Sequence, residues 1–179
     1  MFQIKPLVSC NVTSMAMALS YLDYAFPKGA YSQPEDNLRD FIEGRGGNPE
    51  NHAQLSKGVN DWMGRKVTEF STGVSLDVII ENIKSGKPVV LSGTFPGYPT
   101  KRSAPLGHIV TLVGFEWDGD APKGNPTAAI IDDPYGDTMN NWQNSGNDIK
   151  IPWSLFIDWM KPCGDVSVKW GHLFFAQQS

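Results

Sequence analysis

Cys10 stands directly before a segment whose apolar residues have helical spacing. A cysteine at a helix N-terminus has its sulfur near unpaired backbone N–H groups and the positive end of the helix dipole. Both favour a thiolate over a thiol. Cys10 could therefore be an activated nucleophile, and the alternative is a small buried apolar residue. The partners available to it must decide between the two.

His108 is the residue best placed to share the proton of such a thiol. It begins the apolar run 109–113, which predicts a strand, and it follows a long loop over residues 92–107. The alternative is an exposed or satisfied polar residue at the start of a strand. His52 lacks this combination of loop and strand, whereas His172 also precedes an apolar run and is the fallback candidate.

Two adjacent acids, Asp132 and Asp133, end the next apolar run and precede Pro134. An imidazole base needs an acceptor that fixes its tautomer. Because strand side chains alternate between the two faces of a sheet, only one of these acids can point toward His108. The alternatives are that both acids end a strand and cap a turn, or that they form an incidental cation site with Asp137.

The elements that must position these residues divide the chain into two halves. The first half is predicted to be mainly helical, and the second half is predicted to form an antiparallel sheet, which gives an α+β fold with the helix that follows Cys10 packed on the sheet. Helices are expected at 11–24, 34–43, 52–63 and 75–83 and through Phe156 and Trp159, and strands at 67–70, 89–91, 109–113, 128–131 and 173–175.

Length and charge restrict the class of protein. The chain has 179 residues with 40% hydrophobic content, which suits a single domain over residues 1–179. The 15 basic residues are scattered and the net charge is -4, so nucleic acid is not an expected partner. No apolar run approaches the roughly 18 residues of a membrane helix. The N-terminus lacks the pattern of an export signal, so we expect cytoplasmic synthesis without a secretion signal of its own.

The chain has two cysteines, Cys10 and Cys163, and neither belongs to a CxxC pair. This count is too small for a disulfide scaffold and lacks the spacing of a zinc or redox motif. We expect no metal and no cofactor. A disulfide between the two cysteines remains an alternative for an exported protein, and it would exclude an enzyme that uses Cys10.

Three segments of the chain, in the same order as these candidates, resemble the three sequence blocks of peptidase C39-like proteins in the papain-like superfamily. They are CNVTSMAMAL at residues 10–19, GHIVTLVGF at 107–115 and IDDPYGD at 131–137. Together these blocks span most of the chain. The resemblance implies a papain-like fold and a cysteine hydrolase that requires no metal.

The resemblance also implies a role for each candidate. Cys10 is then the nucleophile, His108 is the general base and later the acid, and Asp133, the acid directly before proline, orients His108. Asp132 is the alternate acid. In such enzymes a glutamine shortly before the cysteine helps to hold the oxyanion together with the cysteine's own N–H. Gln3 is the available glutamine, one residue farther from the cysteine than papain-like spacing, and Asn11 is a second possible donor.

The expected function is cleavage of amide or peptide bonds through a thioester intermediate. The wider C39-like group includes stand-alone bacterial and bacteriophage proteins, and the block at 131–137 followed by an Asn- and Trp-rich loop resembles those most. We therefore expect an endolysin-type enzyme that degrades peptidoglycan at the bacterial cell wall, with Tyr135 and Trp142 on the substrate rim. The alternatives are a cysteine endopeptidase of polypeptides and a catalytically inert C39-like peptide-binding module.

Overall fold

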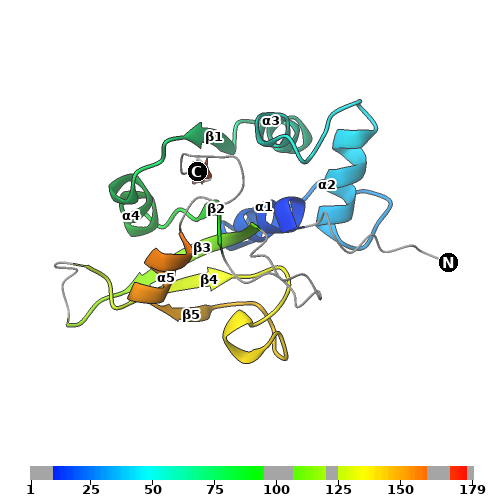
Figure 1. Cartoon of the computed structure of the whole chain (residues 1–179). Helices are drawn as coiled ribbons and strands as arrows, with labels where there is room; N and C mark the ends of the chain where they lie inside the picture. The colour runs from blue at the N-terminus through cyan, green and yellow to red at the C-terminus, as the bar shows by residue number, and fades with distance from the viewer. Residues whose placement is uncertain (1–9, 95–106, 120–124, 161–169, 177–179) are drawn as a thin grey trace.

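The computed structural model describes residues 10–94, 107–119, 125–160 and 170–176 (Figure 1). Within them the chain forms one antiparallel sheet with strand order β1-β6-β2-β3-β4-β5 and helices on both faces. This confirms the predicted α+β class. The helices are α1 (Cys10–Tyr21), α2 (Pro34–Glu43), α3 (His52–Met63), α4 (Leu76–Lys84), α5 (Trp153–Trp159) and the 3₁₀ turn η1 (Thr138–Asn140). The strands are β1 (Thr68–Thr72), β2 (Val89–Gly93), β3 (His108–Glu116), β4 (Ala128–Asp132), β5 (Ile149–Pro152) and β6 (Trp170–Phe174).

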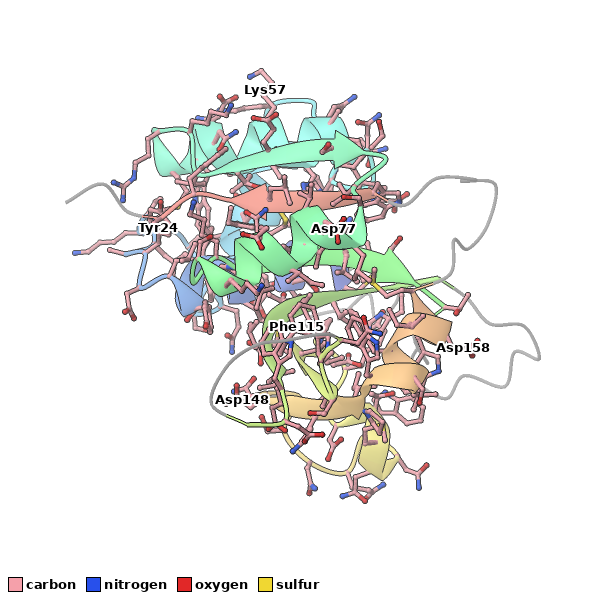
Figure 2. The ribbon with its side chains drawn as sticks, turned by 90° about the vertical axis from the view of Figure 1, so that its left-hand side faces the viewer. Tyr24, Lys57, Asp77, Phe115, Asp148 and Asp158 are labelled. Atoms are coloured by element: carbon pink, nitrogen blue, oxygen red, sulfur yellow. The ribbon has the colours of Figure 1, made fainter. Side chains whose placement is uncertain are left out.

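The sheet separates two hydrophobic cores, and alternation along β2 illustrates how. Val90 packs into the core beneath α1, α2 and α3, whereas Val89 and Leu91 face the opposite core. Helix α4 lies across that second face (Figure 2), and α5 packs on β4 and β5. Figure 1 shows α1, α2 and α3 on one side of the sheet and α4 and α5 on the other.

Local signals explain why several helices begin and end where they do. The side chains of Asn51 and Ser75 each accept a backbone N–H in the first turn of α3 and α4. Helix α2 begins at Pro34, whose fixed φ suits a first helical position. Helix α3 ends at Gly64, which adopts the left-handed conformation with φ 67°.

Several strands differ in their bounds from the sequence-based expectation; β3, for example, ends at Glu116 instead of residue 113, and the largest differences with a physical reason are in β5 and β6. Strand β5 was not predicted, because only four residues separate the preceding polar loop from α5 and Pro152 ends the run; proline is tolerated there because β5 is an edge strand. Strand β6 begins three residues earlier than predicted, at Trp170, and includes Gly171, a residue type that is depleted in strands. A Cβ at Gly171 would lie 3.3 Å from both a Val89 methyl and the Val90 carbonyl, so the close approach of β2 favours glycine.

Helix α1 is fixed to β3 by two reciprocal hydrogen bonds. Ser14 Oγ donates to the carbonyl of Ile109 at 3.1 Å, and Thr111 Oγ1 donates to the carbonyl of Ser14 at 2.8 Å. Ser14 and Thr111 are both fully buried, where hydrogen bonds resist competition from water. The start of α1 and the start of β3 are therefore held in a fixed relation.

In the part of the chain that the structure describes, no helix has the length and apolar character needed to cross a membrane.

Candidate active site

Cys10 is the first residue of α1, and its side chain is partly accessible. Cys10 is a free cysteine, whereas the disulfide alternative would have it bonded to Cys163. Cys163 itself lies outside the described residues. A sulfur at the first residue of a twelve-residue helix lies where the helix dipole favours negative charge. The side chain is hydrogen-bonded to two neighbours, His108 and Tyr135.

His108 and Asp133 meet on the same face of the sheet. Leu112 pairs with Ile131, so alternation along β3 and β4 places His108 and Asp133 on the face that these two residues share. His108 Nε2 lies 2.8 Å from Asp133 Oδ1, and their exposed fractions are 2% and 1%. An ionised carboxylate only accepts, so Nε2 carries the proton and donates it. The other nitrogen, Nδ1, is then the one available to the sulfur of Cys10.

The electrostatics of His108 differ from those of an isolated buried imidazole. Burial is the largest influence and by itself lowers the pKa of His108. Hydrogen bonds to Asp133 and Cys10, together with the negative charges of these groups, outweigh it and raise the pKa from 6.5 to about 9. At neutral pH His108 is therefore an imidazolium between a carboxylate and a sulfur. Such a group can hold a thiolate and can donate a proton to a leaving amine.

Asp132 lies on the other face of the strand and is not beside His108. Its Oδ1 accepts the backbone N–H of Asp148 at 2.8 Å, which closes the loop between β4 and β5. Burial raises the pKa of the Asp132 carboxyl, partly offset by that hydrogen bond. Of the two acids considered from the sequence, the structure brings only Asp133 to the imidazole.

Tyr135 occupies a more central place than the substrate rim where the sequence placed it. Its ring stacks on His108 with centroids 4.6 Å apart and an interplanar angle of 6°. Its backbone N–H donates to Asp133 Oδ1 at 2.8 Å, and its hydroxyl is hydrogen-bonded to Cys10. Sequence reasoning missed these contacts; the only signal available was its position two residues after Asp133.

The structure describes only one of the two side chains predicted to hold the oxyanion, Asn11. Gln3 lies outside the described residues. Asn11 is buried, its Nδ2 donates to the carbonyl of Pro49 at 2.6 Å, and its Oδ1 accepts the N–H of Val12 at 2.9 Å. These bonds connect the start of α1 to the segment before α3 and favour a structural role for Asn11 over that of an oxyanion donor. The N–H of the first residue of a helix has no acceptor within that helix, so the backbone N–H of Cys10 stays the other expected donor.

The loop between β4 and β5 packs against the backbone of Asp133. The N–H of Asp133 donates to the carbonyl of Gly146 at 2.7 Å. A Cβ at Gly146 would overlap the carbonyl oxygen of Asp133, so only glycine fits there without displacing the acid. Trp142 lies in the same loop, half-buried, with a left-handed backbone conformation at φ 58°. Its role at a substrate rim stays a prediction.

The remaining histidines form a separate cluster. His172, the fallback base, is fully buried and its Nε2 lies 3.3 Å from Nδ1 of His52, with Phe70 and Trp170 packed around the pair. Burial lowers the pKa of His52 to about 4, and burial together with the charge of His52 lowers that of His172 to about 3. Within the described ranges, no group of three or more His, Cys, Asp or Glu side chains could hold a metal ion.

Comparison with known proteins identifies a family and a shared fold. The profile of the Peptidase_C39 like family matches residues 1–155 of the chain. The chain belongs to the peptidase C39-like family. A crystal structure from Bacillus anthracis assigned as a C39-like peptidase superposes with a TM-score of 0.56 at 19% identity, covering 94% of this chain and 90% of that one. At that identity the likeness shows a shared fold. No curated protein sequence matches the chain significantly.

Membership of the C39-like family confirms the resemblance identified from the three sequence blocks, which fall within the matched residues. It supports a peptidase type of function. The family also includes inert members, so the activity of this C39-like chain depends on whether its own residues are competent.

Proposed function

We propose that this protein is a cysteine hydrolase in which Cys10 attacks an amide carbonyl, His108 transfers the proton and Asp133 orients His108. The observation that carries the proposal is the chain of contacts from the Cys10 side chain to the imidazole and from Nε2 to the Asp133 carboxylate at 2.8 Å. Catalytically inert relatives need no such arrangement, because a binding cleft does not require a buried charged imidazole beside a cysteine.

The reaction follows from this arrangement. The Cys10 thiolate forms a carbon–sulfur bond with the carbonyl carbon, and the carbonyl oxygen takes the negative charge, facing the backbone N–H of Cys10. His108 Nδ1 gives its proton to the amide nitrogen as the carbon–nitrogen bond breaks, which leaves a thioester and a free amine. His108, now neutral, removes a proton from water, which attacks the thioester and releases a carboxylic acid and the Cys10 sulfur. Asp133 keeps Nε2 protonated throughout, so that Nδ1 is the atom that exchanges the proton.

Peptidoglycan is the substrate class that we propose first, in an endolysin-type role at the bacterial cell wall. The support is the likeness of the IDDPYGD block and its following loop to stand-alone bacterial and bacteriophage C39-like proteins. The net charge of -4 is a mild argument against a wall-binding surface. Cleavage of polypeptides is the second candidate, because the family is one of peptidases.

The reactivity of Cys10 tests the proposed chemistry before any substrate is known. The rate of alkylation by iodoacetamide is measured from pH 5 to pH 10 by peptide mass, with Cys163 in the same molecule as the internal control. We expect fast modification of Cys10 down to about pH 6, although a free thiol has a pKa of about 8.5. If Cys10 and Cys163 follow the same curve, the hydrolase proposal is wrong and a binding module is the better description.

Activity assays then separate the substrate classes. The wild type and Cys10→Ala are compared on purified peptidoglycan by turbidity and on fluorogenic peptides and casein. We expect wall clearance by the wild type and none by Cys10→Ala, with unchanged circular dichroism. Cleavage of the polypeptides alone would support the second candidate. Equal behaviour of the two proteins on every substrate would contradict the enzyme proposal.

A further inference from the structure

We propose that Tyr135 is a fourth member of the active site, whose hydroxyl donates a hydrogen bond to the sulfur of Cys10 while its ring holds His108 in place. This inference rests on the proposed function of Cys10 as a nucleophile. It assigns a residue that was expected only to contact substrate to the preparation of the nucleophile itself.

A single residue contacts all three of the other site residues. The backbone N–H of Tyr135 donates to Asp133 Oδ1, the same oxygen that accepts from His108. The phenol ring lies almost parallel to the imidazole at 4.6 Å. The hydroxyl is hydrogen-bonded to the Cys10 side chain. A side chain anchored at its backbone and along its ring has little freedom left, so its hydroxyl is presented to the sulfur at a low entropic cost.

The hydroxyl is a donor throughout the working pH range. Burial, the charge of Cys10 and the hydrogen bond to it, in that order, raise the pKa of Tyr135 to about 12, and the charge of Asp133 adds to this. A phenol that stays protonated can donate to a thiolate, and a hydrogen bond to a charged acceptor is about twice as strong as one between neutral groups. The thiolate then has two donors, His108 Nδ1 and the Tyr135 hydroxyl.

The turn after β4 brings Tyr135 into this position. Gly136 has φ 113°, in the left-handed half of conformational space, and its N–H donates to the carbonyl of Asp133. A Cβ at Gly136 would lie 3.0 Å from the carbonyl of Asn144. The chain therefore turns sharply right after Tyr135, and the ring is directed back over the imidazole by a closed loop.

Two variants separate the hydroxyl from the ring. Tyr135→Phe removes only the donor and keeps the stacking and the backbone hydrogen bond, whereas Tyr135→Leu also removes the aromatic cover of His108. The matched control is Tyr31→Phe, because the Tyr31 side chain is 44% exposed. The readout is the rate of Cys10 alkylation against pH, together with the pH profile of kcat/KM on the best substrate.

We expect Tyr135→Phe to move the Cys10 alkylation curve about one pH unit upward, which is about a tenfold slower reaction at pH 6, equivalent to about 1.4 kcal/mol. The acid limb of kcat/KM should move in the same direction. Tyr135→Leu should move both further, and Tyr31→Phe neither. A merely structural tyrosine would lower the amount of folded protein without moving either pH profile.

The outcomes distinguish this inference from the proposed function. If the wild type reacts at pH 6 and Tyr135→Phe follows the same curve, the role of Tyr135 is wrong and the hydrolase proposal stands. If the wild type itself has an ordinary thiol profile, the proposed function fails and the inference fails with it. If circular dichroism shows that Tyr135→Phe is unfolded, ultraviolet difference spectra between pH 5 and pH 8 test the contact between Tyr135 and Cys10 instead. A tyrosine signal in the wild type that is absent in Cys10→Ala supports the contact, and identical spectra contradict it.

Discussion

His108 and His172 are both almost completely buried on strands of the same sheet, and their surroundings drive their charge in opposite directions. The pKa of His108 is raised to about 9, whereas that of His172 is lowered to about 3. Burial disfavours the imidazolium in both places. His108 faces the carboxylate of Asp133 and the sulfur of Cys10, while the described neighbours of His172 include the imidazole of His52 and aromatic rings. The partner thus decides whether a buried imidazole can carry a proton.

Removing the charge of Asp133 should have the largest effect on the difference between His108 and His172. Asp133→Asn keeps the shape of the side chain but presents an amide group to His108. It also removes the negative charge that raises the pKa of His108. We expect kcat/KM to fall about 10³- to 10⁴-fold, as happens when an aspartate that orients a catalytic histidine is made neutral. Titration of the His108 ring protons by NMR should show a lower pKa. Unchanged kinetics would exclude Asp133 from catalysis.

Displacing Asp133 without changing its chemistry should have the next largest effect. Gly146→Ala places a Cβ on the carbonyl oxygen of Asp133, so the acid must move away from His108. A misplacement of about 1 Å can cost about 100-fold in rate, and we expect a loss of that order in kcat/KM. Gly114→Ala is the control, because the nearest atom to its new Cβ would be Cδ1 of Ile130 at 3.2 Å, the flexible end of a side chain. Similar activity of the two variants would show that the loop behind Asp133 is adaptable.

The His52–His172 pair should weaken the fold in acid. Both pKa values are lower in the folded state than the ordinary 6.5, so the unfolded chain binds more protons below that pH. The stability is complete above about pH 6.5 and falls as the pH drops toward about 4 and then 3. The slope is at most about 1.4 kcal/mol per pH unit for each histidine. Guanidinium unfolding at pH 7, 6, 5 and 4.5 measures it.

His52→Phe is the control for this acid sensitivity. Phenylalanine keeps a ring against Phe70 and Trp170 but takes up no proton, so the free energy of unfolding should change less between pH 6.5 and pH 4. Identical slopes in the wild type and the variant would assign the acid sensitivity to other groups.

Asp132→Asn should have the smallest effect. Its side chain accepts the N–H of Asp148 through one oxygen, and asparagine retains that acceptor. We expect kcat/KM to change less than about threefold, measured beside Asp133→Asn. A loss comparable to that of Asp133→Asn would mean that the two adjacent acids act together.

Much of the fold could be predicted from the sequence, because periodic apolar residues and caps are local signals. The helices at 34–43 and 52–63 begin and end where the sequence indicates. Cys10, His108 and Asp133 were identifiable because each stands at the end of a predicted helix or strand. Strand β5 was missed because four residues, one of them proline, carry little periodic signal.

The contacts of Tyr135 and the pairing of His52 with His172 could not be predicted in the same way. The first depends on how the turn at Gly136 closes, and the second joins residues 120 positions apart. In both cases the chemistry comes from tertiary packing, and a residue's own neighbours in the sequence contain no information about it.

The last strand of the sheet has a consequence for synthesis of the protein. Strand β6 lies between β1 and β2, so among the strands that the structure describes β1 is joined to the sheet through residues 170–174. A chain still emerging from the ribosome contains Cys10, His108 and Asp133 before it contains this strand. Contacts between residues so far apart form late because the entropy of closing a long loop must be overcome first. The nascent chain therefore cannot complete its sheet, and with it the framework under α3, until residues 170–174 have been synthesised.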